Sequence, residues 1–174
     1  MTTGNISLGL IKPKSPTNVG SVMRAAGCYG VNSVFYTGSR YDRANKFCTD
    51  TRPAESSIPL NCVDNLLDHV QAGMKVVCVE LVLGATPLPG YRHPQQVMYI
   101  FGPEDGTLSQ ELIDRADDVV YIPTNGCMNL AATVNVVLYD RLSKSDLGFA
   151  GDDWIRQSRD TNNRVKRSKQ KQTD

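Results

Sequence analysis

An asparagine and an arginine stand six positions apart in the segment SPTNVGSVMRAAGCYG, which covers residues 15–30. Arg24 lies among small residues and glycines that are otherwise suited to close packing. A single cation in such surroundings either pairs with a carboxylate of the same protein or binds an anion from outside. Asn18 either caps a helix or contacts a ligand. The segment alone leaves both pairs of alternatives open.

Sequence patterns for several other kinds of chemistry are missing. The chain contains neither GxxxxGK[ST] nor GxGxxG, so a glycine-rich loop for nucleotide phosphates is not expected. The five cysteines form no CxxC pair and, with the two histidines, no zinc-binding spacing. We therefore expect reduced cysteines and no metal. His69 falls in a helical pattern and His93 in a loop before a proline, so we expect both on the surface and neither as a catalytic base.

The composition is that of one soluble globular domain. The chain has 174 residues, of which 40% are hydrophobic and 21% charged, and this length suffices for one core. We expect a folded domain over residues 1–150 and a basic, flexible tail over residues 151–174. No signal segment or membrane span is visible, so we expect a cytoplasmic protein that has no membrane partner.

The tail has two interpretations. Residues 156–174 hold seven Lys and Arg against two Asp, whereas the rest of the chain is net acidic. With Val165 as their one aliphatic residue, they cannot bury enough apolar surface to fold alone. Basic residues such as Lys166 and Arg167 either contact nucleic acid phosphate or only keep the protein soluble.

Short apolar segments alternate with helical patterns along the chain. We expect strands at 6–11, 33–38, 75–82, 96–102 and 118–123, and helices at 18–28, 63–73, 108–116 and 129–142. Residues 39–62 are polar and irregular and predict a surface excursion. The strands are almost continuously apolar, which is typical of a sheet covered by helices on both faces. The sequence therefore predicts an α/β fold with an open, mostly parallel sheet.

Three loops follow strands at the edge where open α/β sheets bind ligands. Their sequences are LGATPLPG, GPEDGTLS and PTNGCMN. Glycine and small polar residues let backbone amides approach a ligand closely, although turns of every kind are rich in them. Glu104 and Asn129 join Asn18 and Arg24 as polar candidates in this region. We therefore expect a ligand held mainly by backbone groups.

Three motifs, taken in order, resemble those of the SpoU/TrmH branch of the SPOUT methyltransferases. The first is Pro-x-Asn-x-Gly-x-x-x-Arg with a later Gly, matched by Pro16, Asn18, Gly20, Arg24 and Gly30. The second is a Phe/Leu-Gly-x-Glu segment leading to a Leu, matched by Phe101, Gly102, Glu104 and Leu108. The third, Ile-Pro followed by Ser-Leu/Met-Asn-Leu and a helix, is matched by IPTNGCMNLAATVNVVLYD. The resemblance extends over about residues 6–142.

Two positions depart from the family pattern. Cys127 stands where serine is usual, and the link from Pro123 to Cys127 is shorter than usual. A thiol is a weak hydrogen-bond donor, so a contact made by that serine would be lost or replaced by backbone. Thr107 stands where a glycine usually precedes the leucine, which affects the expected shape of the loop but not the role of Glu104.

The resemblance implies methyl transfer from S-adenosyl-L-methionine to an RNA ribose 2′-hydroxyl. It favours tRNA over rRNA as the partner, because no added RNA-binding domain is visible. It also implies a C-terminal trefoil knot and a homodimer in which Arg24 reaches the partner's site. For catalysis it points to Arg24, Asn18, Glu104 and Asn129, and for cofactor binding to Leu81, Val82, Phe101, Gly102, Ile122, Cys127 and Met128.

The roles that follow for the side chains are chemical expectations. A guanidinium stays protonated to about pH 12, so Arg24 is expected to bind RNA phosphate and stabilise a developing alkoxide and not to act as a base. Glu104 either holds a turn by accepting backbone amides or orients Arg24 or Asn129. Two alternative functions stay open, a catalytically silent RNA-binding relative and a SPOUT enzyme that methylates a base nitrogen.

Overall fold

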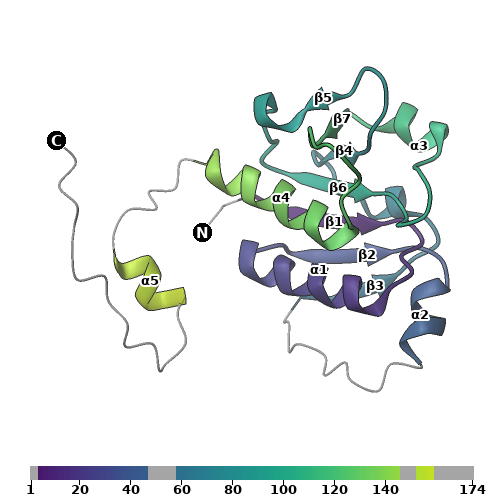
Figure 1. Ribbon diagram of the computed structural model, residues 1–174, viewed down its shortest axis with the longest axis horizontal. Helices are drawn as coiled ribbons and strands as arrows, with labels where there is room; N and C mark the ends of the chain where they lie inside the picture. The colour runs from purple at the N-terminus through teal and green to yellow at the C-terminus, as the bar shows by residue number, and fades with distance from the viewer. Residues whose placement is uncertain (1–3, 47–57, 146–151, 159–174) are drawn as a thin grey trace.

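The computed structural model describes residues 4–46, 58–145 and 152–158. In these ranges one seven-stranded sheet has the order β3-β2-β1-β6-β4-β7-β5, and all of its paired strands are parallel (Figure 1). The predicted α/β fold with an open parallel sheet is confirmed. The strands are β1 (Ile6–Leu10), β2 (Ser33–Tyr36), β3 (Leu60–Cys62), β4 (Lys75–Val79), β5 (Thr86–Pro87), β6 (Val97–Phe101) and β7 (Asp118–Tyr121).

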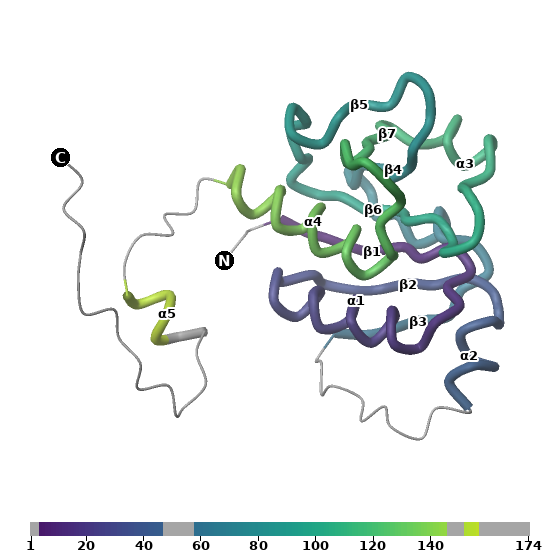
Figure 2. The backbone as a smooth tube through the Cα atoms, in the orientation of Figure 1, coloured from purple at the N-terminus to yellow at the C-terminus, as the bar shows by residue number. Residues whose placement is uncertain are grey.

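Helices cover both faces of this sheet. The two long helices, α1 (Pro16–Tyr29) and α4 (Leu130–Ser143), lie side by side on one face (Figures 1 and 2). The opposite face is covered by the 3₁₀ turn η1 (Leu66–His69) and by α3 (Gln110–Arg115). The remaining elements are α2 (Arg40–Asn45), η2 (Leu88–Gly90) and α5 (Asp152–Ser158). None of the described helices is long and apolar enough to cross a membrane.

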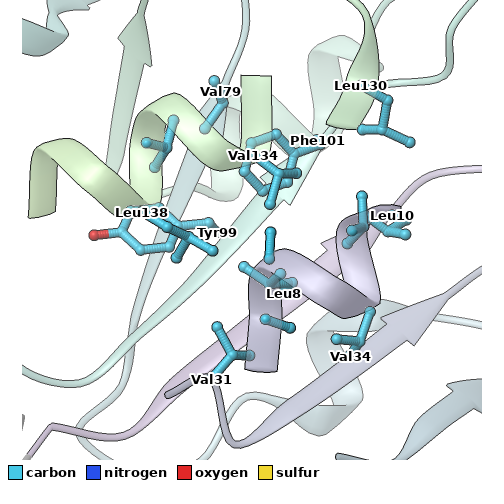
Figure 3. Close-up of a cluster of buried hydrophobic side chains, with 14 of the residues drawn as sticks. Leu8, Leu10, Val31, Val34, Val79, Tyr99, Phe101, Leu130, Val134 and Leu138 are labelled. Atoms are coloured by element: carbon cyan, nitrogen blue, oxygen red, sulfur yellow. The ribbon is translucent and has the colours of Figure 1, made fainter. Parts of the chain in front are cut away.

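The central strands supply apolar side chains to both faces, as their continuous apolar sequences predict. All five residues of β1 and all five of β6 are buried. In β6, Tyr99 and Phe101 belong to the cluster beneath α1 and α4 (Figure 3), whereas Met98 and Ile100 belong to the cluster beneath η1 and α3. Alternate residues of a strand face opposite sides, so one strand contributes to two cores. These two cores fix the strand ends on which the site depends.

Several predicted elements differ from the observed ones. The helix expected over residues 63–73 is only the single turn η1, because Asn65 is still extended and Val70 is extended again. The irregular excursion expected over residues 39–62 contains α2 and the edge strand β3 in its described part. In the segment expected to be a flexible tail, residues 152–158 form α5, and the residues after 158 lie outside the described ranges.

The expectation that His93 is a surface residue is wrong. Its side chain is 4% exposed, with one ring nitrogen 2.6 Å from the hydroxyl of Tyr99 and the other 2.8 Å from the carboxylate of Asp140. Burial lowers the pKa of His93 despite the neighbouring Asp140. The contact joins the segment before β6 to α4, so His93 positions that helix. His69 is exposed, as predicted, and stacks on Phe35.

The strand order bears on the knot that the family resemblance implies. β7 lies between β4 and β5, both of which precede it in the chain. The last strand therefore enters the sheet between two segments that come earlier in the sequence. Such an insertion is compatible with a trefoil knot, which stays a prediction.

Candidate active site

A cavity lies at the carboxyl ends of β4, β6 and β7, the edge where open α/β sheets bind ligands. Its walls come from the loops after these strands and from the first turns of α4. Glu104 lines it, but Val82 is not among its described lining residues. The lining includes six of the seven residues expected for cofactor binding: Leu81, Phe101, Gly102, Ile122, Cys127 and Met128.

Strand register brings these loops together. Val79, the last residue of β4, pairs with Phe101 at the end of β6 and with Val120 in β7. Parallel strands in such register end at nearly the same height, so the loops that follow them meet at one edge. Segments far apart in sequence therefore form the two sides of one cavity.

Glu104 links the loop after β6 to the start of α1. Its carboxylate accepts hydrogen bonds from the backbone N–H of Lys14 at 2.7 Å, the backbone N–H of Ser15 at 3.1 Å and the side-chain amide of Asn18 at 3.1 Å. Partial burial alone would raise the pKa of Glu104, but these hydrogen bonds outweigh it and lower the pKa. Two roles were expected for Glu104, and these hydrogen bonds match the first of them, in which Glu104 holds a turn by accepting backbone amides.

Glu80 makes a second link, between the loop after β4 and the loop after β6. Its carboxylate accepts from the backbone N–H of Leu108 and of Leu81, both at 3.0 Å. Gly102 leaves the space for it, since a Cβ atom there would lie 3.0 Å from Glu80 Oε2 and 3.6 Å from Leu108 Cγ. Glu80 also lines the cavity. Sequence reasoning missed this residue, whose one signal was an acidic side chain inside the apolar segment expected as a strand over residues 75–82.

Side-chain caps begin the two long helices. Ser15 caps α1, its hydroxyl accepting from the backbone N–H of Asn18 at 3.3 Å. Asn129 caps α4, its side-chain oxygen accepting from the N–H of Ala132 at 2.7 Å, which confirms the prediction that Asn129 begins the last helix. The cap of α1 is therefore Ser15, and Asn18 uses its side chain to bind Glu104.

Arg24 lies outside the described lining of its own chain's cavity. It is exposed on α1. No ion pair between described residues involves Arg24, so the salt bridge considered for it is not seen in this part of the chain. The neighbouring Gly20 and Ser21 are exposed and small. The guanidinium is therefore accessible to an anion from outside.

An exposed ion pair stands beside the Glu104 link. Arg40 of α2 donates two hydrogen bonds to the carboxylate of Asp105, at 2.8 and 2.6 Å. Arg40 lowers the pKa of Asp105 to about 2. Asp105 is not among the described residues that line the cavity, so it is a control for charge changes near the site.

Two further expectations concern metals and the tail. Among the residues that the structure describes, no group of three or more His, Cys, Asp or Glu side chains could hold a metal ion. Lys166 and Arg167 lie outside the described residues. Their contact with nucleic acid stays a prediction.

Comparisons with known proteins show which family model and which solved structures this chain matches. The model of the SpoU rRNA Methylase family matches residues 5–139. No curated protein sequence is similar enough to match. The SpoU methyltransferase AviRb from Streptomyces viridochromogenes, solved with AdoMet, has 21% identity and a TM-score of 0.67, with 81% of this chain and 58% of that chain covered.

Two other solved structures are similar. An AdoMet-bound rRNA methyltransferase from Sinorhizobium meliloti has 21% identity and a TM-score of 0.66, covering 80% of this chain and 56% of that one. A structure described as addressing the 2-OH methylation of C/U34 on tRNA has 23% identity and a TM-score of 0.67. The match covers 81% of this chain and 96% of that one. This chain thus spans less than two thirds of the two AdoMet-bound proteins. At these identities the likeness shows the fold.

We predict that Glu104→Gln lowers the free energy of unfolding at pH 7 by about 1 kcal/mol, because the one amide nitrogen would then face either the N–H of Lys14 or the donors of Ser15 and Asn18, which bond to different oxygens of the carboxylate. Asp105→Asn, which removes the same charge one residue further on, should lower it less. Urea unfolding of both variants measures the difference.

The difference in stability between wild type and Glu104→Gln should depend on pH. The folded-state pKa of Glu104 is lowered, so its stabilisation is fully present above the ordinary value of 4.5 and is lost as pH falls through the folded value. The gap between wild type and Glu104→Gln should therefore close in acid. A gap that stays constant down to acid unfolding would contradict the role given to Glu104.

Proposed function

The chain belongs to the SpoU rRNA Methylase family, and from this premise we propose that it transfers a methyl group from S-adenosyl-L-methionine to a ribose 2′-hydroxyl of RNA. The observation that carries the proposal is the cavity at the ends of β4, β6 and β7, lined by six of the residues expected for the cofactor. The accessible guanidinium of Arg24 supplies the second requirement, a group that binds RNA phosphate.

The cavity fits the chemistry of S-adenosyl-L-methionine. Leu81, Ile122 and Met128 offer apolar surface for an adenine ring, and Gly102 and Gly106 let backbone groups approach closely. The carboxylates of Glu80 and Glu104 suit a ligand that carries positive charge. The bound cofactor would supply a methyl group already activated on a sulfonium. The protein therefore needs to align an oxygen nucleophile and does not need a covalent intermediate.

Arg24 is proposed to activate that oxygen without acting as a base. Its guanidinium can hold an RNA phosphate by two parallel hydrogen bonds and stabilise the alkoxide that develops on the 2′-oxygen. The phosphate or a water molecule takes the proton, since a guanidinium carries only donors and has no acceptor position. Asn18 and Glu104 act by positioning Arg24, because their hydrogen bond holds the first turn of the helix that carries Arg24.

We propose a homodimer in which Arg24 of one copy serves the cavity of the other. The position of Arg24 outside the described lining of its own cavity supports this arrangement. The exposed residues around Arg24 are small, and Tyr139 of the adjoining helix α4 is 62% exposed. A second copy can thus approach this face closely and cover apolar surface.

For the RNA, we propose tRNA. The structure described for 2-OH methylation on tRNA is covered over 96% of its length by this chain, so the two folded parts are of similar extent. Basic residues near the end of the chain, among them Lys166 and Arg167, are proposed to add affinity for phosphate that does not depend on sequence.

Mapping ribose methylation in total RNA from cells with and without the gene tests this function. We expect one tRNA nucleotide to lose its 2′-O-methyl group in the deletion strain, as read by nuclease digestion and mass spectrometry. Loss of a methyl group from a base nitrogen would contradict the ribose assignment. An unchanged methylation map, together with no cofactor binding by calorimetry, would identify a silent RNA-binding relative.

We predict that Arg24→Ala lowers the turnover number by roughly a hundredfold or more, because a stabilising charge next to the nucleophile is lost. The dissociation constant for S-adenosyl-L-methionine should stay the same. Arg43→Ala is the matched control, since Arg43 is exposed on α2 and its described hydrogen bond is to Ser39 of the same segment. Full turnover by Arg24→Ala would defeat the role given to this residue.

Mixed dimers test whether Arg24 acts across the subunit interface. Gly102→Val fills the cavity beside Glu80 and should abolish cofactor binding, and Arg24→Ala removes the guanidinium. Random pairing of the two inactive chains should restore about a quarter of wild-type activity, because half the dimers hold one complete site. Activity that stays at the level of the separate variants would show that Arg24 serves its own chain.

A further inference from the structure

The charged side chains of the cavity have one sign. Glu80 and Glu104 line it, and its described lining contains no Lys or Arg. Beside the cavity, Arg40 is paired with Asp105, which offsets its charge. Within the described lining, the charged side chains that a ligand in the cavity meets are therefore all negative.

Of these two carboxylates, Glu80 has more acceptor capacity to spare. Glu104 accepts from Lys14, Ser15 and Asn18 and is committed to the backbone of the preceding loop. Glu80 accepts one hydrogen bond on each oxygen, from two backbone N–H groups. A carboxylate offers about four acceptor positions, so Glu80 retains free positions beside the cavity.

The surroundings of Glu80 keep its charge effective. Glu80 directly follows β4, whose residues Val76 to Val79 are all buried. Burial, with a further contribution from Glu80, raises the pKa of the nearby Cys78 thiol to about 12. Glu80 itself is half-buried, and a half-buried carboxylate is less screened by water than one on an open surface. Its field therefore reaches a ligand in the adjoining cavity.

We propose that Glu80 selects the charge of the cofactor, favouring the cationic methyl donor over the neutral product of transfer. This inference rests on the proposed function. During transfer the bond between sulfur and methyl breaks, its electron pair stays on sulfur, and a bond from the ribose oxygen to the methyl forms. The ribose oxygen gives up its proton to phosphate or water. The sulfonium thus becomes a neutral thioether, and Glu80 no longer attracts it, so the product leaves more readily.

The experiment compares dissociation constants for S-adenosyl-L-methionine and S-adenosylhomocysteine by calorimetry, in wild type and in Glu80→Gln. We expect wild type to bind the cationic donor more tightly than the product. In the variant, the ratio of the dissociation constant for the product to that for the donor should fall by roughly three- to tenfold, which is the scale of one partly screened charge pair. Asp114→Asn is the control, because Asp114 is exposed on α3, its described hydrogen bond comes from the neutral side chain of Gln110, and it is not among the described cavity lining.

The ratio of the two constants separates charge from structure. Loosening of the loop that Glu80 holds through Leu108 would weaken both ligands equally and leave the ratio unchanged, which would overturn the proposal. An equal change of the ratio in Asp114→Asn would overturn the assignment to Glu80. If neither ligand binds to wild type, the proposed function itself fails.

A second measurement uses wild type alone, should Glu80→Gln not fold. Raising the salt concentration screens charge, so the constant for the donor should weaken more than the constant for the product. Equal salt dependence of the two constants would contradict selection by charge.

Discussion

The site depends on the hydrogen bonds that the carboxylate of Glu104 accepts. It accepts two backbone N–H groups from the segment between β1 and α1 and the side-chain amide of Asn18 in the first turn of α1, 86 to 90 residues earlier in the chain. Backbone donors at a loop junction need acceptors when water is displaced, and one ionised group satisfies several at once. This link sets the start of α1, and with it the place of Arg24. Glu80 repeats the device one strand further along, so two carboxylates join the loops after β1, β6 and β4. The loops after β6 and β4 line the cavity.

The architecture follows from features that the sequence displays openly. Strands such as β6 are continuous apolar runs, and helices α1 and α4 have buried residues at helical spacing, so both kinds of element were predictable. The edge strands β3 and β5 were not, because they have three and two residues and are largely exposed. Their position depends on pairing with a neighbouring strand, which no local pattern reveals.

The site was predictable to the extent that its residues belong to family motifs. Six expected cofactor residues line the cavity, and α4 begins at Asn129 as expected. Glu80 and His93 were missed because their meaning lies in partners distant in sequence, Leu108 for one and Asp140 for the other. The local sequence around a carboxylate beside a strand, or around a histidine before a proline, is the same whether the side chain ends on the surface or in the interior. Only the tertiary contacts distinguish them.

A crystal structure of the protein with bound S-adenosyl-L-methionine tests the central claim most directly. The account predicts the cofactor in the cavity at the ends of β4, β6 and β7, with the hydrogen bonds from Lys14 and Ser15 to Glu104 and from Leu108 to Glu80 all intact. A cofactor bound elsewhere, or bound in this cavity with those loops separated and both carboxylates turned to solvent, would contradict it.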